Sequence, residues 1–221
     1  MPTVPDIPAT PIQHRDERLF LLIVMVLAAV AGLGSWFAAT ALSHHDRSQI
    51  RMPEKSRKLV NFSLTDSAGR DVTRAGLDGK ILVVSFLFTS CSLTCPEVSR
   101  RMAEIQRLTA DLPDVRLLSL TVDPRSDTPP VLARWAARFG AETNRWRLLT
   151  GAKSVLYNLI GTSFLVVETN NPFNSMPGNF AGTERIALVD RHGNIRAFFD
   201  GLRAETPAAV VAEIAALELE K

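Results

Sequence analysis

Two hydrophobic patterns alternate along most of the chain and predict one α/β domain over residues 61–221. Continuous apolar runs at 81–88 (ILVVSFLF) and 115–122 (VRLLSLTV) are typical of strands that are buried on both faces. Apolar side chains at helical spacing follow residue 97 and recur in 129–139 and 207–217. The last two segments each begin with Thr-Pro, which favours the start of a helix.

Shorter segments complete the predicted domain. The segment 62–73 (FSLTDSAGRDVT) predicts two strands around a glycine-containing turn. After a strand at 146–150 and a short helix near 152–160, further strands are expected at 163–168 (SFLVVE), 185–190 and 195–200, the last two joined by the turn RHGN. This order of elements predicts a thioredoxin-like fold with an N-terminal β-hairpin.

The stretch 19–42 contains no charged residue and predicts a single transmembrane helix. Its 24 residues are enough to cross a hydrocarbon core of roughly 30 Å. The alternative is a cleaved signal peptide, but its apolar region would run only about 7–15 residues. We therefore expect a polar tail at 1–18, an anchor at 19–42 and a tether at 43–60.

Charges around this predicted anchor give a conflicting indication of topology. Arg15 and Arg18 precede it, whereas five basic residues lie between positions 47 and 58. The positive-inside rule alone would place the domain in the cytoplasm. The family resemblance given below implies the extracytoplasmic side.

The net charge of +2 is spread along the chain. No dense basic segment is present, so the sequence gives no indication of nucleic-acid binding.

The two cysteines of the chain, Cys91 and Cys95, are the candidate chemistry. They stand in FTSCSLTCPE, between a predicted buried strand and a predicted helix, and Pro96 suits the first turn of that helix. A helix N-terminus favours thiolate over thiol and lowers a cysteine pKa. The spacing indicates either a reversible disulfide or a site for a soft metal ion such as Cu(I).

The cysteine pair also has two purely structural interpretations. Free cysteines are often buried and inert, which would make both of them packing residues. A purely structural disulfide is the other, although so short a loop constrains the unfolded chain little.

The domain resembles the Sco/SenC family of membrane-anchored factors that assemble the copper site of cytochrome c oxidase. The resemblance runs from FSLTDSAGRDVT through LDGKILVVSFLFTSCSLTCPE and LTVDPRSDTPPVLARWAARFG to RWRLLTG. It implies a single N-terminal anchor and a thioredoxin-like domain outside the cytoplasm, where cysteines can be oxidised. It also implies a membrane location and a partner that is the oxidase copper-site subunit or another thiol or copper protein.

In the family, the two motif cysteines bind copper together with one histidine from a later loop. Here that loop reads GTER (182–185), and Gly182 occupies the ligand position. Met176 is a weak substitute whose simpler interpretation is loop packing. The four histidines lie elsewhere in the sequence: His14, His44, His45 and His192.

The missing histidine changes the expected chemistry. Two thiolates suit Cu(I), whereas Cu(II) prefers nitrogen and oxygen donors and would oxidise the thiolates. We therefore expect a divergent Sco-like protein weighted toward thiol redox work. The alternatives are a general extracytoplasmic thiol–disulfide oxidoreductase, or a peroxidase-like reductase in which Arg100 or Arg101 would assist the thiolate.

Overall fold

The computed structural model describes residues 25, 49–51, 57–164, 167–168 and 180–220. Contacts divide the chain into residues 1–47 and residues 48–221. Within the described ranges, no helix is both long and apolar enough to cross a membrane. The predicted anchor at 19–42 lies outside those ranges except for Met25, which is helical.

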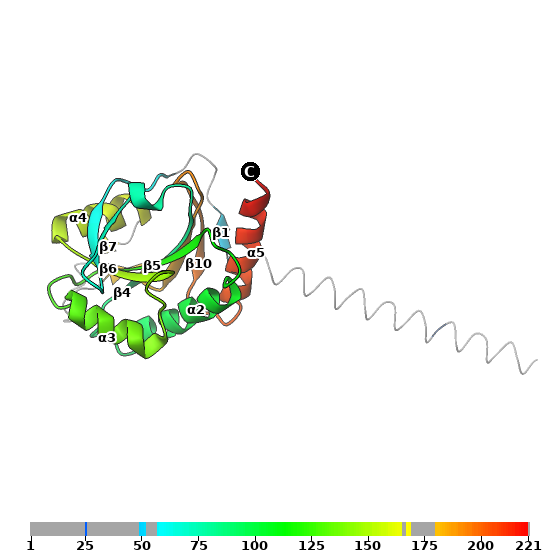
Figure 1. Ribbon diagram of the computed structural model, residues 1–221. Coiled ribbons are helices and arrows are strands. Elements are labelled where there is room, and N and C mark those ends of the chain that lie inside the picture. Colours follow the sequence, from blue (N-terminus) through cyan, green and yellow to red (C-terminus); the bar gives the residue numbers. More distant parts are fainter. Residues whose placement is uncertain (1–24, 26–48, 52–56, 165–166, 169–179, 221) are drawn as a thin grey trace, which may run out of the picture. The chain divides into compact units, whose positions relative to one another are not determined.

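An eight-stranded mixed sheet forms the centre of the domain, in the order β1-β10-β9-β4-β5-β6-β2-β3 (Figure 1). Strands β4, β5 and β6 are parallel, whereas β9 is antiparallel to β4 and β10 is antiparallel to β9. The bounds are β1 Gln49–Arg51, β2 Ser63–Asp66, β3 Asp71–Thr73, β4 Ile81–Leu87, β5 Val115–Thr121, β6 Trp146–Thr150, β9 Arg185–Val189 and β10 Ile195–Asp200. A separate pair joins β7 (Val167–Glu168) to β8 (Phe180–Ala181).

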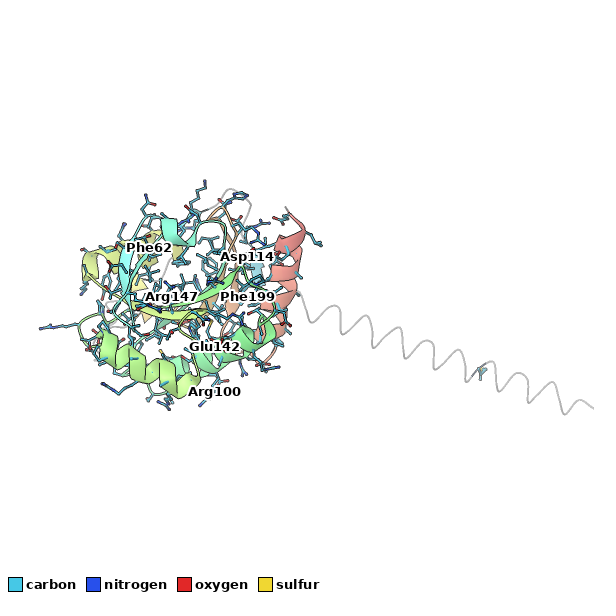
Figure 2. The ribbon with its side chains drawn as sticks, in the orientation of Figure 1. Phe62, Arg100, Asp114, Glu142, Arg147 and Phe199 are labelled. Carbon is cyan, nitrogen blue, oxygen red and sulfur yellow. The ribbon has the colours of Figure 1, made fainter. Side chains whose placement is uncertain are left out.

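Helices cover both faces of the sheet. They are α2 (Thr94–Leu108), α3 (Pro129–Phe139), α4 (Lys153–Leu159) and α5 (Thr206–Leu219), with a short 3₁₀ turn at Ala75–Leu77. The core that contains Phe199 lies beneath α2, α3 and α5, and the core that contains Phe62 lies beneath α4 (Figure 2). Each core therefore closes one face of the same sheet.

Most predicted elements are confirmed for a physical reason visible in the sequence. Every residue of β4 is buried, as its continuous apolar run indicates. Helix α3 begins after Thr128 with proline at its first position and ends at Gly140, whose φ of 66° is the left-handed conformation that favours glycine. Strands β2 and β3 form the predicted hairpin.

The predicted strand at 163–168 is only partly correct. Its first two residues belong to a π-helical turn, Ile160–Phe164, and strand β7 covers only the last two. The Ser163 hydroxyl accepts a hydrogen bond from the Val60 backbone N–H at 3.1 Å. The Phe164 ring packs edge-on against Phe86, with ring centroids 5.3 Å apart. Both contacts favour the helical turn over an extended strand.

Two further features differ from the expected pattern. Residues 49–51, inside the predicted tether, form β1 against β10. In α2, Leu108 continues the helical spacing of apolar residues that predicts a buried face, but it is 40% exposed, whereas Gln106 is buried. Gln106 is held there because its amide donates to the Gly140 carbonyl at 3.0 Å and accepts from the Glu142 N–H at 2.9 Å.

Candidate dithiol site

The two cysteines lie at the carboxyl end of β4, where α/β sheets commonly place their sites. A turn after β4 is closed by the Cys91 N–H, which donates to the Phe88 carbonyl at 3.0 Å. Helix α2 begins at Thr94, so Cys95 is in its first turn and Cys91 is in the preceding loop. Cys91 is half-buried, whereas Cys95 is 1% exposed within the core beneath α2. The predicted placement of both residues is confirmed.

The Cys91 sulfur serves as a cap for the N-terminus of α2. The residue at the N-cap position, Leu93, makes no side-chain capping bond. Instead, the Cys95 backbone N–H donates to the Cys91 Sγ at 3.3 Å, and the Thr94 hydroxyl lies 3.3 Å from the same sulfur. A negatively charged sulfur at this position is stabilised by these donors and by the helix dipole.

The two thiols have opposite pKa shifts. Burial of Cys91 acts to raise its pKa, but the hydrogen bonds from Thr94, Cys95 and Leu93 outweigh it and lower the pKa. Burial raises the pKa of Cys95 to about 12, and a hydrogen bond to the Cys91 side chain adds to the rise. The pair therefore contains one accessible sulfur that ionises readily and one buried sulfur that keeps its proton.

This asymmetry is the arrangement that dithiol–disulfide exchange requires. Both cysteines are free, and the Cys91 sulfur accepts the Cys95 backbone N–H at 3.3 Å. An accessible thiolate can attack a disulfide, and a neighbouring thiol can then resolve the mixed disulfide. The half-buried Cys91 sulfur, with its donors at the helix start, argues against two inert packing cysteines.

A buried carboxylate fixes the loop that leads to Cys91. Asp127, in the segment VDPRSDTP, is fully buried. Its oxygens accept the Thr89 backbone N–H at 3.2 Å, the Thr89 hydroxyl and the Thr121 hydroxyl. Asp127 thus joins the end of β5 to the loop two residues before Cys91, and it is a positioning residue of the site.

Gly182 lies at the same edge of the sheet as the cysteines. Ile186 of β9 pairs with Ser85 near the end of β4, so the residues just before β9 continue beyond that end. Gly182 itself is buried and has a φ of 97°. A glycine hydrogen supplies no metal ligand, and the part of the chain that is described contains no cluster of three or more His, Cys, Asp or Glu side chains able to hold a metal. Among the described residues, the two sulfurs suit a soft ion, and no third His, Cys, Asp or Glu ligand accompanies them.

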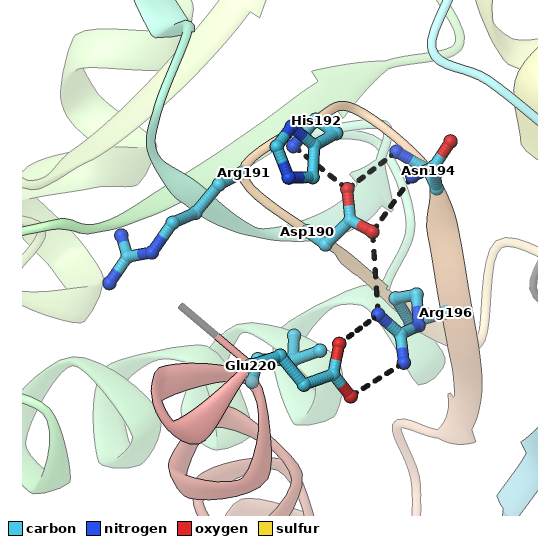
Figure 3. Close-up of a pocket in the computed structure, with 7 residues that line it drawn as sticks. Asp190, Arg191, His192, Asn194, Arg196 and Glu220 are labelled. Carbon is cyan, nitrogen blue, oxygen red and sulfur yellow. Dashed lines mark hydrogen bonds and ion pairs between the residues drawn. The ribbon is translucent and has the colours of Figure 1, made fainter.

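His192 is far from the cysteines in the fold. It lies in the turn between β9 and β10, next to the start of β4, because Leu82 pairs with Val189. Its backbone N–H donates to Asp190 at 2.9 Å. Figure 3 shows it beside a polar pocket of about 420 Å³ that is separate from the dithiol site. The interpretation of His192 as a turn residue is confirmed.

The two arginines that a peroxidase-like reductase would use are paired with a glutamate instead. Arg100 and Arg101 both form ion pairs with Glu97 on the outer surface of α2. Figure 2 shows Arg100 at the outside of the helical layer. The donors that lower the Cys91 pKa come instead from the helix start.

Two residues of this site, Thr94 and Asp127, are not predicted from the sequence. The signal for Thr94 is its hydroxyl directly before Cys95. Asp127 stands in a recognisable motif, but its hydrogen-bond partner Thr89 is 38 residues away in sequence. Met176, the weak substitute ligand, lies outside the described residues.

Comparison with known proteins agrees with the resemblance seen in the sequence. The SCO1/SenC family model matches residues 51–218. The SCO1 protein homolog of Bacillus subtilis (strain 168) is 34% identical over 91 residues, which cover 41% of this chain and 47% of that protein. The mitochondrial SCO2 homolog of Bos taurus is 34% identical over 128 residues, covering 55% and 48%. The chain thus spans about half the length of these curated relatives.

Solved structures show the same fold. A SCO1/SenC family lipoprotein from Bacillus anthracis str. Ames has a TM-score of 0.66 at 24% identity, covering 74% of this chain and 96% of that one. ScoI of Bradyrhizobium japonicum, solved with copper bound, has a TM-score of 0.60 at 27% identity, covering 73% and 99%. These likenesses confirm the predicted thioredoxin-like α/β fold. The family model matches residues 51–218, which are most of this chain. The chain therefore belongs to the SCO1/SenC family.

Proposed function

We propose that this chain acts in assembly of the cytochrome c oxidase copper site by reducing a disulfide of its partner with Cys91 and Cys95. The observation that carries this is the asymmetry of the pair. The half-buried Cys91 sulfur accepts the Cys95 backbone N–H and has a lowered pKa, whereas burial raises the pKa of the Cys95 thiol to about 12. A solved relative, BsSco, is a member of the Sco family of cytochrome c oxidase assembly proteins and has a disulfide switch. That relative supports both the role in oxidase assembly and the use of a reversible disulfide.

The reaction transfers two electrons from the dithiol to the partner. The Cys91 thiolate attacks one sulfur of the partner disulfide, which forms a mixed disulfide and releases the other partner sulfur as a thiolate that takes up a proton. The Cys95 thiol then loses its proton and attacks the Cys91 sulfur. This forms the Cys91–Cys95 disulfide and releases the second partner thiolate, which is protonated in turn. The partner gains two thiols, and this chain gains one disulfide.

The location that we propose follows from the uncharged stretch 19–42. It would hold the chain in a membrane as a single-pass anchor, with residues 61–221 on the extracytoplasmic side. A dithiol reductant has substrates there because disulfides form and persist outside the cytoplasm.

Delivery of Cu(I) as cargo is the second candidate. It is favoured by the placement of both cysteines at the start of α2, where the Cys95 N–H meets the Cys91 Sγ at 3.3 Å, and by the copper-bound relative ScoI. Two thiolates suit Cu(I), but the absence of imidazole at Gly182 removes a donor that Cu(II) would prefer.

Trapping of the mixed disulfide tests the exchange reaction. The Cys95→Ser variant of the full-length protein, in mild detergent, should accumulate a covalent adduct with a disulfide-bonded peptide of the oxidase copper-site subunit. Cys91→Ser should not, because the attacking sulfur is gone. An adduct on Cys91→Ser alone would contradict the assigned roles. Equal reaction with unrelated disulfides would favour a general oxidoreductase.

Anaerobic titration of the reduced protein with Cu(I), against a competing chelator, tests the cargo role. Tight one-to-one binding that is lost in Cys91→Ser supports delivery. No binding in the wild type removes this candidate and leaves the exchange reaction unaffected.

A further inference from the structure

Leu93 is an exposed apolar side chain between the two reactive cysteines. It is 82% exposed and stands at the N-cap position of α2, where it makes no capping hydrogen bond. Ser, Thr, Asn or Asp at this position would cap the helix with a side-chain oxygen, which an apolar residue cannot do. Leu93 is therefore unfavourable both as an exposed apolar group and as a helix cap. Local rules are most often broken at functional positions.

The loop that carries Leu93 has no charged side chain. Residues 88–96 contain no acidic or basic side chain, and Ser90 and Ser92 are the other exposed residues of the loop. The nearest charged side chains along α2, Glu97 and Arg100, are paired with each other. This loop is thus suited to contact an uncharged, partly apolar segment.

The covalent step brings a partner polypeptide within reach of Leu93. A mixed disulfide with Cys91 holds the two cysteine Cα atoms about 4.4–6.8 Å apart. The Leu93 Cα is at most about 7 Å from the Cα of Cys91, because only one residue separates them. A side chain beside the partner cysteine can therefore reach Leu93, whereas a small disulfide need not touch it.

We propose that Leu93 is the contact that selects partner segments with an apolar side chain next to their reactive cysteine. This rests on the proposed exchange reaction and specifies its substrate class. Covering Leu93 with an apolar neighbour removes apolar surface from water in the encounter and in the mixed disulfide. Leu93 accelerates reaction with such polypeptides and leaves reaction with small disulfides unchanged.

The test uses reduced full-length protein and three oxidants. Two are disulfide dimers of short peptides that differ only in a Leu or a Ser beside the cysteine, and the third is hydroxyethyl disulfide. Leu93→Ala, which shortens the side chain without adding a hydrogen-bond acceptor at the N-cap, is compared with the wild type and with Leu219→Ala. Leu219 is a matched control because it is 87% exposed but lies at the end of α5.

We expect the wild type to prefer the Leu peptide over the Ser peptide by about tenfold in second-order rate constant, equivalent to about 1.4 kcal/mol. Leu93→Ala should abolish this preference and keep the wild-type rate with hydroxyethyl disulfide. Leu219→Ala should match the wild type with all three oxidants.

Three outcomes would overturn the inference. Equal wild-type rates with the two peptides, beside a normal rate with hydroxyethyl disulfide, would refute the role of Leu93 alone. A Leu93→Ala rate that falls equally with all oxidants would show that the residue acts on the thiols. Failure of the wild type to reduce hydroxyethyl disulfide would refute the exchange function itself, and the Leu93 proposal with it.

Discussion

The two sulfurs of the site should react over different pH ranges. Because the Cys91 pKa is lowered, its thiolate persists at pH values below the ordinary cysteine pKa of about 8.5. Because the Cys95 pKa is raised to about 12, Cys95 stays protonated until the solution is strongly alkaline. At pH 7, iodoacetamide should therefore modify Cys91 of the reduced protein and leave Cys95 intact. Mass spectrometry of peptides after timed alkylation checks this, and faster labelling of Cys95 would reverse the assigned roles.

Asp127 should influence Cys91 without touching it. Asp127→Asn removes a charged acceptor from the hydrogen bonds to Thr89 and Thr121, and we expect a loss of about 1–3 kcal/mol in the free energy of unfolding. The Thr89 loop should also shift, which would change the pH profile of Cys91 alkylation. Asp123→Asn is the matched control, since Asp123 is in the same segment and is only partly buried. An unchanged alkylation profile in Asp127→Asn would limit Asp127 to a stabilising role.

At the scale of elements, the β10–α5 loop holds the segment before β9 in place. The Gly201 N–H donates to the Glu184 carbonyl at 2.7 Å. A Cβ at Gly201 would lie 2.6 Å from that oxygen and 3.0 Å from a Val98 methyl group of α2. Gly201→Ala should therefore destabilise the fold by about 1–3 kcal/mol in urea unfolding. Gly161→Ala is the control, because its Cβ would meet no atom within 4 Å. If Gly201→Ala is as stable as Gly161→Ala, the close packing around Gly201 is contradicted.

Elements whose pattern is set by neighbours in sequence were predictable. The continuous apolar run of β4 and the Thr-Pro and Gly ends of α3 determine those elements locally. The π-helical turn was not predictable, because Ser163 and Phe164 are held by partners about 80–100 residues away in sequence. The same holds for the site. The spacing of the cysteines indicates exchange chemistry, but their burial, and hence which sulfur ionises, depends on the packed core.

At the scale of the whole molecule, we expect the residue at position 182 to determine whether the site can bind Cu(II). Gly182→Ala should cost about 1–3 kcal/mol of stability, because a φ of 97° is unfavourable for a residue with a Cβ. Gly182→His should carry the same cost and, in addition, bind Cu(II) with a thiolate-to-copper absorption band that Gly182→Ala lacks. Absorption spectra of the two variants make the comparison. A folded His variant without the band would place residue 182 out of reach of the cysteines.

The central claim is that Cys91 and Cys95 form an exchangeable dithiol, and the reduction potential of the pair tests it most directly. The full-length protein would be equilibrated in glutathione and dithiothreitol buffers of graded potential, and its thiols would be counted after acid quenching. We predict a potential above about −300 mV with oxidation and reduction that are both complete and reversible. A potential well below about −300 mV, with no exchange against a model disulfide, would identify a structural bond and contradict the account.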